Sequence, residues 1–341
     1  MVSSLYGALE SGLIYAIMAL GVYLSFRILD FPDLTVDGSF VTGGAVASVM
    51  IVGGVDPFTA TMTGAAVGFV AGCFTGLLHT KGKINPLLAG ILMMIALYSI
   101  NLRIMGQPNI PLLNETTLFT VIGSWWGGLS LDAILVAPFE LVGLTDYAPR
   151  TFLVIVTMVL IVLIVKKVMD FFLRTEAGLT LRATGDNQTM VKSFSANTNI
   201  YIILGIGLSN ALVALSGALI TQHNGFADVN LGVGMIIIGL ASVIIGEVLF
   251  GKDKVVRMTL AVILGAITYR VIYSLALRID FLEPSDMKLI TAIIVITALV
   301  LPNWFHQNNA KKQFKKSKEA SQKRGNVKKG GVSIASTESS S

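Results

Sequence analysis

The chain has 341 residues, of which 54% are hydrophobic and only 13% are charged, and its mean hydropathy is +0.76. A water-soluble domain of this length would be unusually apolar. The formal net charge of +5 comes largely from the C-terminal tail, without a folded basic face elsewhere, so we expect no binding to nucleic acid.

Apolar segments between charged, Pro or Gly residues predict about nine transmembrane helices, because each can cross a hydrocarbon core of about 30 Å. The first segment lacks a charged start and is too long for a signal peptide, so we expect it to be retained. The sequence therefore predicts an all-α, polytopic membrane protein whose transmembrane domain covers residues 1–304. The expected helices lie near residues 5–26, 34–53, 57–80, 84–104, 150–173, 199–222, 232–250, 255–277 and 287–304.

The basic residues predict an orientation with the N-terminus outside and the C-terminus inside, because Lys and Arg near helix ends resist translocation. With the C-terminus inside, most basic residues fall on the inner side: Arg27, Lys81, Lys83, Lys166, Lys167, Arg174, Arg182, Lys192, Lys252, Lys254, Arg257 and the lysines of the tail. Those that fall outside or within a helix are Arg103, Arg150, Arg270, Arg278 and Lys288.

Two segments, in the second and seventh expected helices, resemble each other. DLTVDGSFVTGGAVAS starts at Asp33, and DVNLGVGMIIIGLAS starts at Asp228. Each has an Asp, a short β-branched or polar stretch, two close glycines and a helix rich in small residues. Because they would run in opposite directions through the bilayer, we interpret them as parts of an inverted repeat.

The third expected helix carries glycines at every fourth position. Such a stripe lets another helix backbone approach closely, which is how helices associate in lipid. We expect it to pack helices within the bundle, and a contact between two copies of the chain is the alternative. The glycines are Gly64, Gly68, Gly72 and Gly76.

The segment 105–149 is expected to be a long external loop, since its apolar run is interrupted by Asp132, Pro138 and Glu140. Trp125 and Trp126 suit a membrane interface, so we interpret part of it as an interfacial helix or a re-entrant segment.

Charged side chains inside the expected spans are candidates for a translocation pathway, because each costs roughly 2.5 to 3.5 kcal/mol in lipid unless it faces protein or water. Glu10 and Arg270 both fall in the outer half. They could pair with each other, face the charged groups of a passing amino acid, or serve a structural role near the interface. Asp37 and Glu247 lie nearer the inner ends, and we count Asp37 as a weaker pathway candidate.

The sequence contains no apparent catalytic set, metal-ligand spacing or cofactor motif. Its single cysteine, Cys73, lies in an apolar segment, and its three histidines are scattered. We expect no enzyme activity, metal or cofactor in this chain, so an ion gradient or another subunit must drive it.

The segment 174–199 is a long polar connection on the inner side, and such loops commonly have a function. We expect it to dock a cytosolic partner, with small residues allowing a short helix to sit in the partner's groove. The candidate contact residues are Glu176, Arg182, Ala183, Gly185, Asp186 and Asn187. The alternative is a plain surface loop.

Residues 305–341 are rich in Lys and end in a Ser-rich stretch, which predicts a disordered, basic cytoplasmic tail. Attraction to anionic membrane lipid is one interpretation, and a solvated stop-transfer tail is the other.

From about Leu5 to Trp304, the chain resembles the permeases of ABC importers of the branched-chain amino acid type. EAGLTLRATGDN, starting at Glu176, resembles the segment that couples these permeases to their ATPase, and FPDLTVDGSFVTGGA, starting at Phe31, resembles the start of their second helix. The second motif is similar to a subgroup associated with aromatic, tryptophan-like amino acid uptake. Glu176-Ala177-Gly178 departs from the longer importer signature, so the resemblance does not fix individual contact residues.

The resemblance implies a second copy of the permease, a cytosolic ABC ATPase dimer and an extracytoplasmic substrate-binding lipoprotein, in a bacterial cytoplasmic membrane. ATP hydrolysis would then occur on the separate ATPase. An ion-coupled secondary transporter is the alternative function, and a structural or anchoring subunit is a third.

Overall fold

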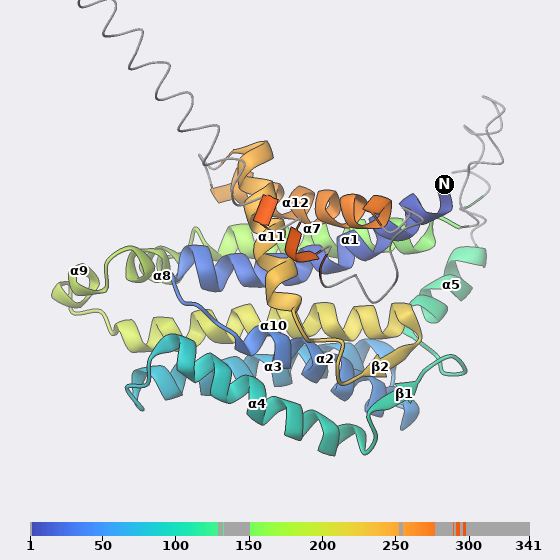
Figure 1. Ribbon diagram of the computed structural model, residues 1–341, viewed down its shortest axis with the longest axis horizontal. Helices are drawn as coiled ribbons and strands as arrows, with labels where there is room; N and C mark the ends of the chain where they lie inside the picture. The colour runs from blue at the N-terminus through green and yellow to red at the C-terminus, as the bar shows by residue number, and fades with distance from the viewer. Residues whose placement is uncertain are drawn as a thin grey trace, which may run out of the picture. The chain divides into compact units, whose positions relative to one another are not determined.

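The computed structural model describes residues 2–128, 132, 151–251, 255–276, 289, 291–293, 296 and 297 (Figure 1). The chain divides into two units, Met1–Ala292 and Ile293–Ser341. The described helices and strands with assigned bounds all belong to the first unit. The expected ninth helix falls largely outside the described residues, and the expected basic tail falls entirely outside them.

The described part is almost entirely helical, which confirms the predicted all-α class. Its helices are α1 (Val2–Tyr23), continued by a π-helical turn η1 (Leu24–Ile28), α2 (Thr35–Val52), α3 (Pro57–Thr80), α4 (Pro86–Met105), α5 (Leu118–Gly128), α7 (Leu153–Phe172), α8 (Glu176–Asp186), α9 (Gln188–Ser193), α10 (Thr198–Asn224), α11 (Met235–Phe250) and α12 (Val255–Ala276). Two short strands, β1 (Asn109–Pro111) and β2 (Phe226–Asp228), pair antiparallel, with Ile110 opposite Ala227.

Six segments are long and apolar enough to cross a membrane. They are Ser4–Ile28, Thr35–Val52, Pro57–Thr80, Pro86–Met105, Thr198–Asn224 and Val255–Ala276. Of the other two expected spans, α11 has only 16 residues, and α7 carries Lys166, Lys167 and Asp170 near its end.

Local sequence signals define several helix ends. Asp56 accepts hydrogen bonds from the N–H groups of Phe58 and Thr59 at the start of α3, where proline is the first helical residue. α10 ends at Gly225, whose φ of 76° is in the left-handed region that favours glycine.

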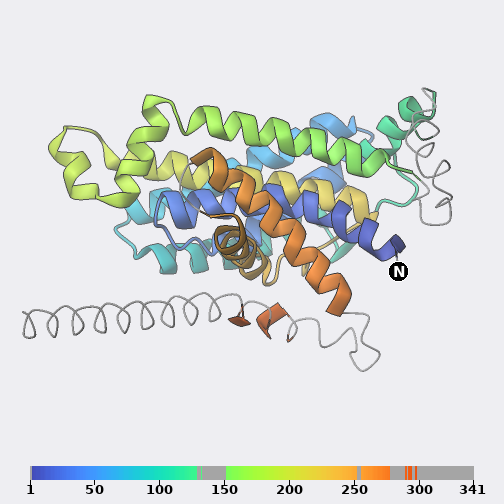
Figure 2. The same cartoon turned by 90° about the horizontal axis from the view of Figure 1, so that it is seen from above.

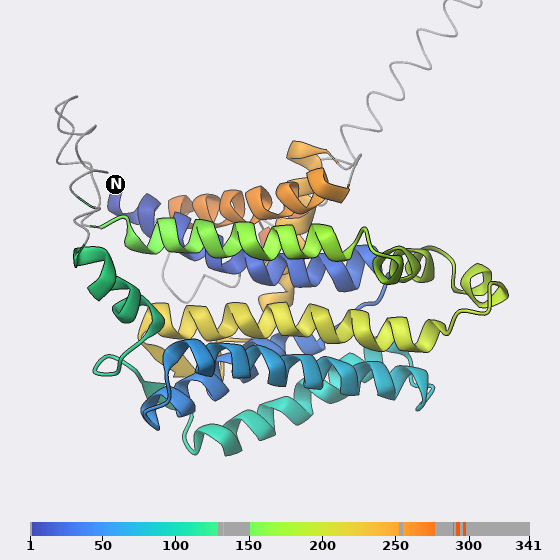
Figure 3. The same ribbon diagram turned by 180° about the vertical axis from the view of Figure 1, so that it is seen from behind.

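Helix α10 lies at the centre of the bundle (Figure 1). It packs against α2 and α3 on one side and α1 on the other, while α12 covers α1 (Figures 1 and 3). α11 runs steeply across these helices and is seen nearly end-on in Figure 2. α8 and α9 lie at one end of the bundle, and α5 with the two strands lies at the other (Figure 1).

Glycines allow the central helices to touch through their backbones. A β-carbon at Gly43 of α2 would overlap the carbonyl of Ala214 in α10, and one at Gly217 of α10 would overlap the carbonyl of Phe40. The stripe on α3 faces the same neighbours: Gly64 contacts Gly43, and Gly68 contacts Ala214. Gly72 and Gly76, farther along the stripe, face Ile206 and Ile203 of α10.

Two helices begin partway along the bundle. The segment before α2 brings Asp33 beside Asn210, which is near the middle of α10, and only then does α2 start. The turn after β2 places Gly232 against the backbone of Asp37, so α11 also starts inside the bundle, beside the first turn of α2. From there α11 runs toward the end of α1, where Glu247 contacts Arg27.

Candidate functional site

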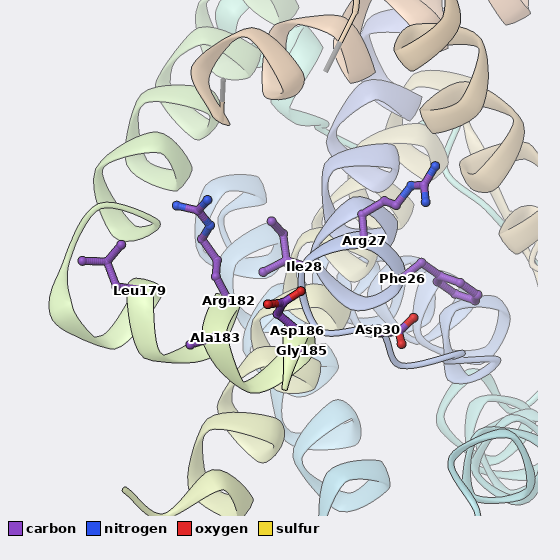
Figure 4. A pocket seen from close by; sticks show the side chains of 9 residues that line it. All are labelled: Phe26, Arg27, Ile28, Asp30, Leu179, Arg182, Ala183, Gly185 and Asp186. Carbon is purple, nitrogen blue, oxygen red and sulfur yellow. The ribbon is translucent and has the colours of Figure 1, made fainter. Parts of the chain in front are cut away.

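A hollow of about 650 Å³ lies between η1 and α8 (Figure 4). Arg182 and Asp186 project from α8 toward it, and Arg27 and Asp30 come from the end of α1 and the residues that follow (Figure 4). Its lining is therefore mostly polar and of mixed charge. The full lining is Phe26, Arg27, Ile28, Asp30, Leu179, Arg182, Ala183, Gly185 and Asp186.

Glycines hold α8 against the rest of the chain. A β-carbon at Gly185 would overlap the carbonyl of Ile28, and one at Gly178 would overlap the carbonyl of Phe172. Leu181, between them, is buried against Gly205 of α10. Gly185, expected to make room for a partner, thus lies directly against η1 of its own chain.

The remaining predicted contact residues of this segment have different positions. Asn187 caps α9 by accepting a hydrogen bond of 3.0 Å from the N–H of Met190. Glu176 stands in the first turn of α8, where a negative charge complements the helix dipole. Both side chains are exposed, whereas Ala183 is half-buried at the wall of the hollow.

Large apolar side chains are exposed on α8, α9 and the residue that follows α9. They are Leu179, Met190 and Phe194, with exposed fractions of 52%, 44% and 77%. Exposed apolar side chains on a polar segment are available for contact with a partner. We call these three residues the α8–α9 apolar surface.

Two ion pairs join or brace helices in this part of the chain, one at the end of α1 and one within α7. Arg27 in η1 binds Glu247 in α11 through both carboxylate oxygens, with the Arg27 Nε to Glu247 Oε1 distance at 2.5 Å. Lys166 and Asp170 form a buried pair at 2.5 Å in α7, and Asp170 also accepts a hydrogen bond from Thr259 of α12. The pair of Arg27 and Glu247 could not be recognised in the sequence, because its partners are 220 positions apart, whereas Lys166 and Asp170 have the i,i+4 spacing of a pair within one helix.

Asp33 is buried beside the first turn of α2. It accepts hydrogen bonds from Asn210 Nδ2 at 2.6 Å and from the N–H of Thr35 at 2.9 Å. Asp228 makes the same local bond, since it accepts from the N–H of Asn230 at 2.7 Å.

Asp37 bonds to the start of α11. Its carboxylate accepts hydrogen bonds from the N–H groups of Gly234 at 2.9 Å and Ile236 at 2.8 Å. A carboxylate is stabilised at a helix N-terminus, because the unpaired N–H groups there carry partial positive charge. Asp37 therefore joins the first turn of α2 to the first turn of α11.

Glu10 and Arg270 do not form an ion pair with each other among the contacts of the described residues. Glu10 Oε2 lies 3.9 Å from His223 Nε2 of α10. The Arg270 guanidinium lies 3.9 Å from the centre of the Tyr15 ring, and Arg270 Nε is buried without a hydrogen-bond partner in the described part. His223, which stood out in the sequence only as a scattered histidine, thus joins this group.

Comparison with known proteins gives a consistent result. The family model described as branched-chain amino acid transport system / permease component matches residues 4–301. A tyrosine transport system permease protein of Clostridioides difficile is 40% identical over 88% of this chain and 92% of its own length. An uncharacterised protein of Rickettsia prowazekii is 34% identical over 86% of this chain and 95% of its own length.

A more distant relative is a ribose import permease protein of Escherichia coli, 22% identical over 89% of this chain and 86% of its own length. No solved structure matches the chain.

Proposed function

Since this chain belongs to the branched-chain amino acid transport system permease family, we propose that it forms the translocation pathway of an ATP-driven importer for an aromatic amino acid, with tyrosine as the first substrate to test. Permeases of this family are integral membrane transport proteins, and the ATPase is a separate subunit. The 40% identity to the tyrosine permease, across nearly the whole length of both chains, carries the choice of substrate.

We propose nine transmembrane helices, with α8 and α9 in the cytoplasm and α5 with the strands outside. The distribution of basic residues supports this orientation. Two copies of the chain, an ATPase dimer and an external binding protein would complete the importer in the bacterial cytoplasmic membrane, with membrane lipid around it.

The proposed contact with the ATPase is the projection formed by α8 and α9. Its apolar surface supports this assignment, as does the packing of Gly185 against η1, which ties α8 to α1. A push on α8 would reach η1, and the pair formed by Arg27 and Glu247 would pass it to α11. This chain of contacts links the ATPase to a helix that starts inside the bundle.

An inverted repeat accounts for the two helices that begin partway along the bundle. Asp33 and Asp228 make the same hydrogen bond to the second residue after them. The helix packing is consistent with a repeat in which α1, α2 and α3 correspond to α10, α11 and α12. In the first half, α3 packs on α2 and on α10. In the second half, the corresponding helix α12 packs on α11 and on α1. Helices broken inside the bundle are typical of transporter substrate sites.

The proposed pathway passes the junction of α2 and α11 at Asp37, and Glu10 with Arg270 contributes charged groups nearer the proposed outer side. Arg270 Nε is buried without an acceptor in the described part, which supports the proposal that Arg270 binds the carboxylate of the substrate.

Co-purification and uptake test the function together. The tagged chain, expressed together with its cognate ATPase and binding protein, should recover the ATPase in mild detergent. In vesicles, the complex should accumulate L-[³H]tyrosine only with ATP. Uptake that needs an ion gradient and no ATPase would instead establish the secondary transporter.

Substitution of Gly185 tests the coupling segment. Gly185→Leu should abolish uptake, because its side chain would displace α8 from η1, and Asp186→Leu should lower it by altering the hollow. Gly127→Leu, on α5 at the opposite end of the bundle, is the control for added bulk, because a β-carbon there would contact nothing within 4 Å. Normal uptake by Gly185→Leu at wild-type expression would refute the coupling role.

A further inference from the structure

A second hollow, of about 380 Å³, lies where α2, α4 and the turn before α11 meet. We call it the α2–α4 hollow. Its walls come from the first half of α2, the middle of α4 and residues 229–233. The volume lies in the range of small-molecule sites and suits one amino acid. It borders Asp37 and is separate from the hollow at α8.

The α2–α4 hollow has a polar group and an apolar wall. Asp37, Ser99 and Asn101 supply polar atoms, while Met94 and Tyr98 supply apolar and aromatic surface. Met94, Tyr98 and Asn101 follow one another at intervals of four and three residues, which places them on one face of α4. That face therefore combines an aromatic ring with an amide one turn away.

Asn101 is the most informative residue of this site. Only 1% of it is exposed, and its Nδ2 donates to the carbonyl of Gly38 at 3.2 Å. Because a backbone carbonyl only accepts, this bond fixes which way the amide points. Its Oδ1 then has no donor among the described residues. A buried acceptor of this kind calls for a ligand that donates.

The start of α11 contributes a second feature. The Asp37 carboxylate accepts hydrogen bonds from the N–H groups of Gly234 and Ile236, and Asp37 also borders the hollow. A cation in the hollow would therefore lie beside the Asp37 carboxylate, and the unpaired amide oxygen of Asn101 is buried in the wall of the same hollow. Both favour an ammonium group over a carboxylate.

We propose that the α2–α4 hollow binds the amino acid during its passage. Asn101 Oδ1 accepts a hydrogen bond from the ammonium group, Asp37 supplies the opposing charge, and Tyr98 with Met94 packs against the apolar side chain of the substrate. This assignment rests on the proposed import function and adds the residues that contact the substrate.

Thiol labelling tests whether substrate reaches the hollow. In the complete importer, with Cys73→Ala removing the native thiol, Tyr98→Cys is compared with Leu88→Cys. Both positions are on α4 and are about equally exposed, at 47% and 49%, but Leu88 does not line the hollow. A charged thiol reagent should label Tyr98→Cys, and L-tyrosine with ATP should slow that labelling while leaving Leu88→Cys unchanged.

In a Tyr98→Cys complex that still imports L-tyrosine, labelling that L-tyrosine does not alter would overturn the proposal. Labelling only by a lipid-soluble maleimide would also overturn it and would indicate an acyl chain in the hollow.

Transport stoichiometry tests the role of Asn101. Asn101→Leu replaces both amide groups with methyl groups, so it removes the acceptor together with the hydrogen bond to the Gly38 carbonyl, and it should raise the ATP hydrolysed per L-[³H]tyrosine imported by about tenfold. Ile100→Leu, an exposed neighbour outside the hollow, should keep the wild-type ratio. A variant that merely loosens the fold would lower hydrolysis and uptake together.

The two proposals fail in different ways. If the wild-type complex shows no ATP-dependent tyrosine uptake, the proposed function fails. If the wild type imports tyrosine and Asn101→Leu does so at the same ratio of ATP to substrate, only the site fails.

Discussion

The packing around α10 differs from the packing around α8 in what holds the helices together. At α10, backbone touches backbone through Gly43, Gly217 and the glycine stripe of α3. At the α8 end, glycines also make close contacts, but an ion pair, a polar hollow and exposed apolar side chains accompany them.

This difference suggests that the packing around α10 stays fixed, whereas the contacts around α8 can break and form again. Backbone packing without side chains has one close arrangement, and any added atom forces the helices apart. An ion pair whose arginine is half-exposed can break and reform at a lower cost than a pair in which both side chains are buried. We therefore expect substitutions near α10 to prevent folding, and substitutions near α8 to change transport.

Gly43→Leu should have the largest effect on folding. Its side chain would overlap the backbone of Ala214, and we expect a loss on the order of 3 kcal/mol or failure to accumulate. Thermal unfolding of the purified protein in detergent measures this. The matched control is Gly7→Ala, because a β-carbon at Gly7 would contact nothing and alanine favours the helix. Equal stability of both variants would mean that α2 and α10 are not in close contact.

Asp170→Asn should be nearly as destabilising, because it leaves Lys166 buried without its charge partner, at a cost of about 3 kcal/mol. The double variant Lys166→Met/Asp170→Asn should recover most of the loss, since no buried charge remains. Thermal unfolding of the single and double variants gives the coupling between them. Additive effects would show that the pair is not formed.

Glu247→Gln should change stability by no more than about 1 kcal/mol, because the Arg27 side chain that it leaves unpaired is 51% exposed, whereas Arg27→Gln should cost more, because it leaves the Glu247 carboxylate, 9% exposed, without its charge partner. Each should nevertheless slow ATP-driven uptake severalfold, since α11 loses its link to α1. The charge-swapped variant Arg27→Glu/Glu247→Arg should restore uptake. A swapped variant as slow as the single ones would show that the residues act separately.

Phe194→Ala should have the smallest effect on stability, within about 0.5 kcal/mol, because its side chain is 77% exposed. It should still reduce the ATPase recovered with the permease. Leu113→Ala is the control at the opposite end of the bundle, with an 83% exposed side chain. If both variants recover the ATPase equally, the α8–α9 apolar surface does not bind it.

The sequence by itself determined the all-α class and the positions of eight of the nine expected helices, because long apolar runs and caps such as Asp56 act locally. It also placed a polar segment with helical stretches between α7 and α10. The motifs at Phe31 and Glu176 indicated the permease family, which the match over residues 4–301 confirms.

Only the tertiary structure decided which polar groups meet. Asp37 and the start of α11 are nearly 200 positions apart in the chain, and Arg27 and Glu247 are 220 positions apart. No periodicity or local motif records such pairs, since they depend on how the helices cross. For the same reason, only the packing revealed that Gly185 faces its own chain and that the Asn101 oxygen is buried without a donor in the described part.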